Sequence, residues 1–251
     1  MSNENQSRET LAEASILIRH GRSADAIPIL DAIVDADPAG ACALEERGRA
    51  KLFTGDCEGS IADFTRMIAQ WPTNPKGYTC RADARKRAGD LHGAVDDYSS
   101  AIAINPRHPF AFFQRGRLKA ELGEYASAVS DFTADMNVSP EGRLSGLLNR
   151  GRTRYLTGDL AGAISDLTEA IALEGDSPVF GPLFRGRAKF SAGDYDGAIA
   201  DFSAAIKAYP ELTNAYRYRA EARELIGDKQ GAADDQSRYD HLGGRDLPAY
   251  Q

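Results

Sequence analysis

The chain has 251 residues, of which 42% are hydrophobic, an ordinary fraction for a folded protein. Its formal net charge of −7 argues against general binding to nucleic acid or to anionic membranes, because both need a basic surface. No stretch is apolar enough to span a bilayer, and the start MSNENQSRETLAEA lacks the features of a signal peptide, so we expect no membrane insertion and a cytoplasmic location.

A glycine recurs along the chain at intervals of 34 or 35 residues, and a fixed period in this range is typical of solenoids. The anchor glycines are Gly21, Gly55, Gly89, Gly123, Gly158, Gly193 and Gly227. Small residues stand seven before and five after each anchor, where they let two helices approach closely. In five of the repeats a proline stands seventeen residues after the anchor glycine, where it is expected to end the second helix. Each repeat is therefore predicted to be a helix, a tight turn at glycine, and a second helix.

Taken in chain order, residues 1–6 are expected to form a disordered tail, residues 7–244 a single solenoid of seven repeats, and residues 245–251 a loose C-terminal tail. Thr10 and Glu13 have the spacing of a capping box, which predicts a helix start there. The last helix, GAADDQSRYDHLGG, is polar and carries Gln236 where earlier repeats have a large apolar or aromatic residue. A terminal repeat that no neighbour covers needs such a face, so we expect a monomer.

Three blocks carry the pattern most fully: RGRAKLFTGDCEGSIADFTRMIAQWP, RGRLKAELGEYASAVSDFTADMNVSP and RGRAKFSAGDYDGAIADFSAAIKAYP. They resemble tetratricopeptide repeats (TPRs), and the resemblance covers roughly residues 7 to 244. It implies an all-α fold, a right-handed superhelical solenoid of about seven antiparallel helix-turn-helix repeats. The first helix of each pair would then line a concave groove that binds peptides or proteins. Pentatricopeptide repeats, which read RNA, have a similar period but lack these glycine, alanine and proline marks.

Many charged residues recur in register with the anchor. Repeats two to seven carry an arginine eight before it and an aspartate eight after it, and the first repeat lacks both. This co-occurrence predicts an Arg–Asp ladder between helices, within or between repeats. A second basic row lies four before the anchor, and an acidic row directly after it, where a helix start favours negative charge. The rows hold twelve basic and twelve acidic residues, so we assign them to the scaffold.

By the resemblance, positions thirteen, ten, six and three before the anchor face the groove. The residues we expect to bind a partner are Arg49, Phe110, Phe113, Arg117, Arg152, Tyr155, Phe180, Leu183, Arg187 and Phe190. Arginine grips carboxylates through two hydrogen bonds and aromatic rings supply buried area, so we expect an acidic or C-terminal peptide with an apolar anchor. The alternative is that some aromatics pack between helices and the arginines are solvated.

Some TPR modules bind the C-terminal carboxylate of heat-shock chaperones through Lys/Asn, Asn and Lys/Arg on successive repeats. At the corresponding positions only Asn149 matches in repeats four to six, and only Lys76 in repeats one to three. We therefore do not expect a chaperone clamp of this kind.

Catalytic and metal-binding patterns are missing from the sequence. The four histidines lie at different offsets from the anchor, the three cysteines form no CxxC pair, and no phosphate-binding loop or nucleophile motif occurs. We expect no enzyme activity, cofactor or metal. Two functions remain open: an adaptor that binds a protein or peptide in its groove, and a structural subunit that self-associates or joins a larger complex through its repeat ends. The polar last helix favours the adaptor.

Overall fold

The computed structural model describes residues 2–37, 40–108, 110–175 and 178–244. All regular elements in these ranges are helices, so the predicted all-α class is confirmed. The chain divides between Leu122 and Gly123, within the fourth repeat, into two compact units, and each unit is described by itself. No helix in these ranges is both long enough and apolar enough to cross a membrane.

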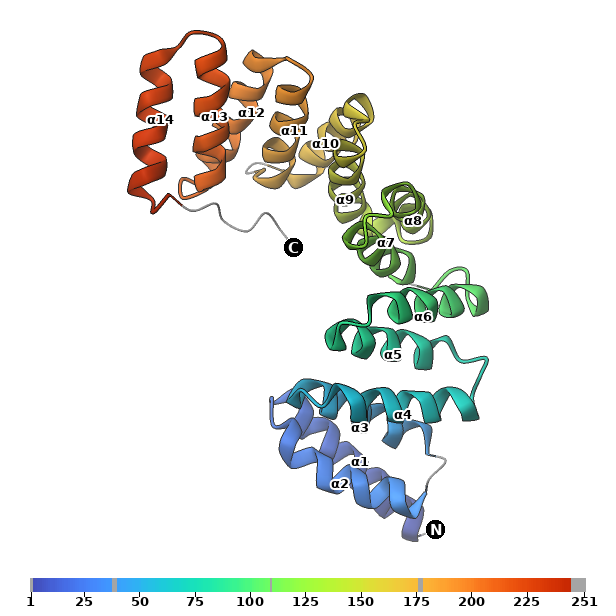
Figure 1. The fold of residues 1–251 in the computed structure, drawn as a ribbon. Coiled ribbons are helices and arrows are strands. Elements are labelled where there is room, and N and C mark those ends of the chain that lie inside the picture. The colour runs from blue at the N-terminus through green and yellow to red at the C-terminus, as the bar shows by residue number, and fades with distance from the viewer. Residues whose placement is uncertain (1, 38–39, 109, 176–177, 245–251) are drawn as a thin grey trace. The chain divides into compact units, whose positions relative to one another are not determined.

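The N-terminal unit is built from helices α1 to α7 (Figure 1). These are α1 (Ser2–Arg19), α2 (Ser23–Ala36), α3 (Ala41–Thr54), α4 (Cys57–Gln70), α5 (Pro75–Ala88), α6 (Leu91–Ile104) and α7 (Ala111–Glu121). Each helix packs against the next along the chain, and the first helices of neighbouring repeats, α1 with α3 and α3 with α5, also touch. The first helices α1, α3 and α5 therefore lie side by side.

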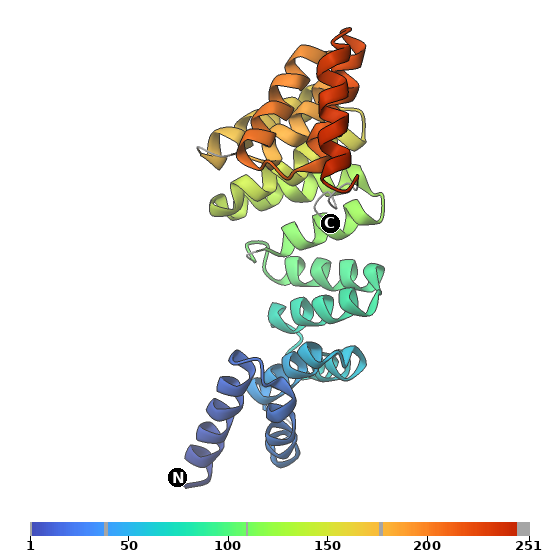
Figure 2. The same ribbon diagram turned by 90° about the vertical axis from the view of Figure 1, so that its left-hand side faces the viewer.

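The C-terminal unit follows the same plan (Figure 2). Its elements are α8 (Tyr125–Val138), the short 3₁₀ helix η1 (Pro140–Gly142), α9 (Arg143–Leu156), α10 (Leu160–Glu174), α11 (Phe180–Ser191), α12 (Tyr195–Ala208), α13 (Thr213–Leu225) and α14 (Lys229–His241). Here α9 touches α11 and α11 touches α13, so these three first helices lie side by side on one face.

The anchor glycines end the first helices in the way their spacing predicts. Gly55, for example, has φ of 92°, and the next residue, Asp56, donates its N–H to Lys51 O over 2.9 Å, as in a glycine-terminated helix. The Asp56 carboxylate then accepts the N–H of Gly59 and caps α4. The acidic row after the anchor is thus a row of helix caps in most repeats.

The small residues allow each hairpin to close around a large side chain. Phe202 of α12 is fully buried against Gly186 of α11, where an added Cβ would lie 2.7 Å from its ring. Ala198 is equally buried one turn away and packs in the same cluster. The predicted rows of small and large residues are therefore the two sides of one helix contact, which confirms the TPR-like solenoid fold class.

The structure differs from the sequence prediction at the N-terminus. Helix α1 begins at Ser2, so residues 2–6 are helical instead of forming the expected tail, and Thr10 lies inside the helix, where it cannot cap its start. No Pro or Gly precedes Gly21, so nothing in the backbone chemistry stops the helix from extending toward its N-terminus. The predicted tail over residues 245–251 lies outside the described residues, and a single solenoid over residues 7–244 stays a prediction.

Candidate functional site

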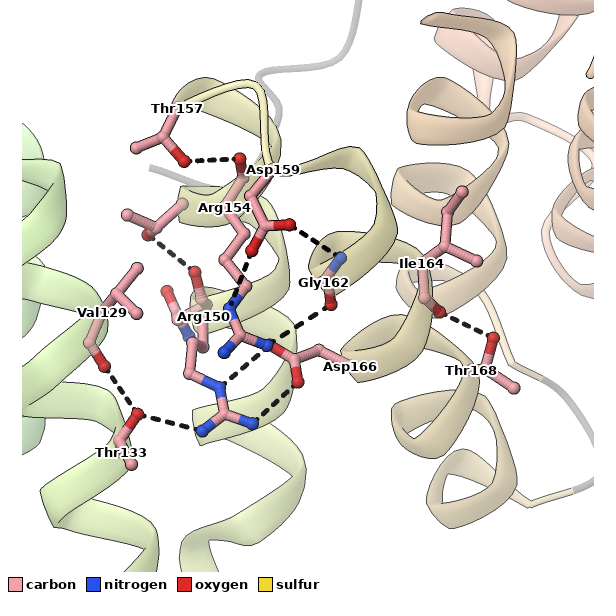
Figure 3. A network of polar contacts seen from close by, with 12 residues as sticks. Val129, Thr133, Arg150, Arg154, Thr157, Asp159, Gly162, Ile164, Asp166 and Thr168 are labelled. Atoms are coloured by element: carbon pink, nitrogen blue, oxygen red, sulfur yellow. Dashed lines mark hydrogen bonds and ion pairs between the residues drawn. The ribbon is translucent and has the colours of Figure 1, made fainter. Parts of the chain in front are cut away.

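The charged rows pair within repeats. Arg150 of α9 donates from Nε and Nη2 to the two carboxylate oxygens of Asp166 on α10, over 2.9 and 2.7 Å (Figure 3). Asp166 is only 4% exposed, so this bidentate contact is a buried ion pair. The same pairing recurs in four other repeats: Arg47–Asp63, Arg81–Asp97, Arg185–Asp201 and Arg219–Asp235. The predicted Arg–Asp ladder is thus formed inside each of these hairpins.

The same arginines also join neighbouring repeats. The third donor of Arg150, Nη1, reaches the hydroxyl of Thr133 on α8 over 2.9 Å (Figure 3). Equivalent bonds to a hydroxyl of the preceding repeat are Arg81–Thr65, Arg115–Ser99, Arg185–Thr168 and Arg219–Ser203. The sequence left open whether the ladder runs within or between repeats, and the structure shows that one guanidinium does both.

The second basic row completes the network. Arg154 Nη1 lies 2.8 Å from Asp166 Oδ2, and its Nε lies 3.5 Å from the helix cap Asp159 (Figure 3). Lys189 makes the matching contact with Asp201 over 2.9 Å. These charges are therefore used to hold the hairpins together, as the cancelling rows predict.

Two arginines on the first helices of the C-terminal unit lie outside these rows. Helices α9 and α11 contain no Asp or Glu. The other basic side chains on them pair with acids of the second helices, namely Arg143, Arg150, Arg154, Arg185 and Lys189. The two further basic residues on these helices are Arg152 and Arg187, and each lies six residues before its anchor glycine.

Aromatic rings lie near both guanidinium groups. The Arg187 guanidinium carbon lies 5.0 Å from the ring centre of Tyr155 on α9 and 5.2 Å from that of Tyr218 on α13. The Arg152 guanidinium carbon lies 5.8 Å from the ring centre of Phe184 on α11. These are cation–π distances, so the rings hold the two side chains in place across three neighbouring helices.

Burial and a neighbouring charge both act on Arg152. Burial lowers the pKa of Arg152, and the positive charge of Arg187 lowers it further. Both residues are half-buried. Helices α9 and α11 therefore hold two neighbouring cations in a partly desolvated, aromatic setting. We call Arg152, Arg187, Tyr155, Phe184 and Tyr218 the arginine–aromatic cluster.

Comparison with known proteins decides the family. The model of the tetratricopeptide repeat matches residues 11–75 and 185–245, about half of the chain. The chain belongs to the tetratricopeptide repeat family. No curated protein sequence matches it. TPR-family proteins are in general non-enzymatic scaffolds for protein interactions.

Solved TPR structures have the same fold. A tetratricopeptide repeat protein from Parabacteroides merdae is 21% identical, with a TM-score of 0.67 and coverage of 95% of this chain and 94% of that one. The C-terminal part of a TPR protein from Cytophaga hutchinsonii is 15% identical, with a TM-score of 0.77 and coverage of 95% and 97%. YrrB, described as a TPR protein with an unusual peptide-binding site, is 16% identical, with a TM-score of 0.61 and coverage of 74% and 95%.

Of the predicted binding residues in the C-terminal unit of this TPR protein, Arg152, Tyr155 and Arg187 come together in the cluster. Leu183 does not line a surface, because it is 3% exposed and packs in the core beside Phe202. Phe190 is half-buried and packs edge-on against the Tyr195 ring. These contacts favour the packing alternative for the two positions, and whether either residue binds a partner stays a prediction.

Phe180, the remaining predicted residue of this unit, starts α11 and is half-buried. Its backbone N–H and that of Gly181 donate to the Glu174 carboxylate at the end of α10. Burial raises the pKa of Glu174, and these hydrogen bonds oppose that rise. Phe180 thus belongs to a helix connection and lies outside the arginine–aromatic cluster.

The other predicted residues lie in the N-terminal unit. Phe110 is 57% exposed and has φ of 65°, a left-handed conformation that bulky residues rarely adopt, while Phe113 and Arg117 are half-buried. Arg49 is exposed, and its Nη1 lies 3.4 Å from Oε1 of Glu46. How these residues bear on partner binding stays a prediction.

The first-helix face of the N-terminal unit differs in its charge. Lys76 of α5 forms a 2.7 Å ion pair with Glu45 of α3, and this bond raises the pKa of Lys76. The Tyr98 hydroxyl donates a hydrogen bond to Asp83, which stands at the position that Arg152 and Arg187 occupy in later repeats. Charges on this face are therefore largely matched by partners from the same unit.

Sequence reasoning missed Phe184 and Tyr218 as members of the cluster. Both stand nine before their anchors, three residues from the position of the groove-facing arginines. Residues three apart share one side of a helix, so this spacing was the available signal. Among the described residues no three His, Cys, Asp or Glu side chains gather as metal ligands would.

Proposed function

We propose that this TPR protein is a non-enzymatic scaffold that binds an acidic segment of a partner protein across α9, α11 and α13. The observation that carries the proposal is Arg187. It contacts two tyrosine rings and forms no ion pair with any described residue, although every other basic side chain of α9 and α11 outside the cluster is matched by an acid.

The chemistry of the cluster suits a peptide that combines negative charge with an apolar side chain. A guanidinium that is already held by aromatic rings loses little side-chain entropy when it pairs with a carboxylate, and its fork of N–H groups matches the two oxygens. Aromatic rings provide apolar contact area, and Tyr and Arg are enriched where binding energy concentrates. The description of YrrB as peptide-binding supports a peptide ligand for this fold.

The proposal keeps the expected monomer and cytoplasmic location. Side-chain bonds along one helix, from Gln230 to Asp234 and from Gln236 to Asp240, give α14 a polar exposed surface. Such a surface suits a terminal repeat in water better than an end-to-end contact. Light scattering is expected to give the mass of one chain. A stable dimer would favour the structural-subunit alternative.

The test of the proposed function is a charge reversal with a matched control. Partners are purified with the parent protein, with Arg152→Glu/Arg187→Glu, and with Lys207→Glu/Arg238→Glu, which makes the same change of charge on exposed residues of the second helices α12 and α14. We expect the first double variant to lose the partner and the control to keep it. Circular dichroism melts verify that both variants fold. An unchanged partner list for Arg152→Glu/Arg187→Glu would contradict the proposal.

A further inference from the structure

A cavity lies in the N-terminal unit beside the turn of the first repeat. Its volume of about 560 Å³ falls in the range of small-molecule sites, about 300–1,000 Å³. The end of α1, the start of α2 and the end of α3 build its wall. We call it the first-repeat cavity, and it is lined among others by Ile18, Arg19, Ser23, Ala24, Arg49 and Phe53.

The start of α2 brings open hydrogen-bond donors to this cavity. In five later repeats an aspartate caps the second helix by accepting a backbone N–H, but Arg22 stands at the cap of α2 and its side chain makes no such bond. Among the described residues, the N–H groups of Ser23 and Ala24 find no acceptor. N–H groups at a helix start carry partial positive charge, so they favour an anion.

Ser23 adds a nearly buried hydroxyl to the same wall. The residue is only 5% exposed, and its side chain forms no hydrogen bond within the described ranges. In those ranges Ser60 alone has a completely buried polar side-chain atom without a partner, so the Ser23 hydroxyl stays accessible from the cavity that its residue lines. A hydroxyl in such a setting is stabilised by a polar group that enters the cavity.

Two arginines from adjacent repeats line the cavity, and they differ in how they are paired. Arg19 of α1 forms no ion pair with any residue that the structure describes, and its Nε lies 3.4 Å from the backbone oxygen of Ser15. Arg49 of α3 has an acidic partner, because its Nη1 lies 3.4 Å from Oε1 of Glu46. The lining therefore has one cation that is not matched by an acid.

The acids closest to the cavity in sequence do not supply the missing charge. Asp25 of α2 pairs with Arg22 over 2.7 Å, and Glu45 of α3 pairs with Lys76 over 2.7 Å. The residues that line the cavity include no Asp or Glu. An incoming carboxylate thus meets no acidic side chain in the wall.

The charge and the apolar surface together select the class of ligand. One unmatched cation balances one carboxylate, whereas a phosphate monoester carries about −1.5 to −2 charges at neutral pH. A free amino acid would place its ammonium beside Arg19 and Arg49, which repel it. Ile18 and the 58% exposed ring of Phe53 offer apolar contact. An apolar acid without an amino group fits best.

We propose that the first-repeat cavity binds a small organic monocarboxylate with an aromatic or aliphatic body. Its carboxylate accepts hydrogen bonds from the N–H groups of Ser23 and Ala24 and pairs with Arg19. Its apolar body packs against Ile18 and Phe53. The site lies apart from the arginine–aromatic cluster and does not depend on the proposed function.

An amide-resolved NMR titration of the full chain with phenylacetate tests the proposal. We expect shift changes at the amides of Ser23 and Ala24. The neutral analogue phenylacetamide has nearly the same shape, and it is expected to bind at least about tenfold more weakly because it lacks the charge. Equal affinities for the acid and its amide, or no binding of phenylacetate, would overturn the inference.

Two variants link the binding to this cavity. Arg19→Gln removes the unmatched cation and is expected to weaken phenylacetate binding at least about tenfold. Ser23→Ala removes the hydroxyl and is expected to weaken it about threefold. Arg87→Gln is the matched control, since Arg87 is exposed and stands two residues before its anchor glycine, as Arg19 does. We expect it to keep the parent affinity, and circular dichroism melts verify that all three variants fold.

The remaining outcomes separate other occupants and other sites. An affinity that survives Arg19→Gln would place the acid elsewhere and overturn the inference. A blocked peptide ending in phenylalanine that shifts the same amides and binds more tightly than phenylacetate would assign the cavity to a peptide terminus, which also overturns it. Arg152→Glu/Arg187→Glu is expected to bind phenylacetate as the parent does, and a loss there would place the probe in the arginine–aromatic cluster and contradict the proposal.

Discussion

The aspartates eight residues after the anchor each bind one or two basic side chains of the same repeat. Asp166 accepts two hydrogen bonds from Arg150 and one from Arg154, and its side chain is nearly inaccessible to water. A buried carboxylate of this kind is stabilised only while its cations are present, and the cations depend on it in the same way.

We predict that Asp166→Asn destabilises the protein by about 3 kcal/mol, because it leaves two partly buried cations without their counter-charge. The free energy of unfolding from urea titrations measures the effect. Asp196→Asn changes an exposed residue of α12 and is the control, with an expected effect within about 0.5 kcal/mol. Equal stabilities of the two variants would contradict the account of the network.

Ser60 is the exception among the small residues five after the anchor. It is fully buried, and its hydroxyl has no hydrogen-bond partner in the described structure, whereas the other six repeats have alanine there. A buried hydroxyl without a partner costs about 1–3 kcal/mol, so Ser60→Ala is expected to raise the unfolding free energy by about 1 kcal/mol. A lower melting temperature for Ser60→Ala would show that the hydroxyl is satisfied in solution.

Repetition decides which residues could be assigned from the sequence. The charged rows are visible because they recur in register, and rows that appear and vanish together predict pairs. The cluster is not repeated: Tyr155, Phe184 and Tyr218 belong to three repeats and two different offsets. Leu183 has the offset expected of a groove residue, yet its side chain packs in a hydrophobic core cluster of this hairpin. Three-dimensional contacts between non-equivalent positions are what the period alone cannot supply.

At the scale of the element, each hairpin depends on the close approach of its two helices. Ala198 of α12 is fully buried beside Phe202, and Gly186 faces them from α11. There is no unfilled space for a larger side chain in such a contact, because protein interiors are close-packed.

We predict that Ala198→Leu overpacks this contact and lowers the free energy of unfolding by about 1–3 kcal/mol. Ala128 of α8 is also fully buried, so we expect the same effect from Ala128→Leu. Thermal melts measure the loss. Ala204→Leu alters an exposed residue of the same helix α12 and is expected to melt with the parent. If Ala198→Leu melts with the parent as well, the assigned contact between the two helices is wrong.

Element boundaries were predicted well where backbone chemistry marks them and poorly elsewhere. The turns at glycine and the caps by aspartate follow from left-handed φ angles and from unsatisfied N–H groups, so their positions were readable. The start of α1 was not predicted correctly, because the capping-box spacing of Thr10 and Glu13 also occurs inside a longer helix.

At the scale of the whole molecule, the repeats were recognisable because seven copies agree on several positions at once. The difference in charge between the first helices of the two units was not recognisable from the sequence. Each unit keeps the same hairpins, yet the N-terminal unit pairs Lys76 with Glu45 across its first helices, and the C-terminal unit places Arg187 between two tyrosines. Partner binding is therefore expected to depend on the C-terminal unit.

Hydrogen–deuterium exchange of the protein, free and saturated with its purified partner, tests the central claim most directly. We expect the partner to slow exchange in α9, α11 and α13, and we expect this protection to disappear when Arg152→Glu/Arg187→Glu is mixed with the same partner. Protection confined to the second helices α10, α12 and α14, or to the N-terminal unit, would contradict it.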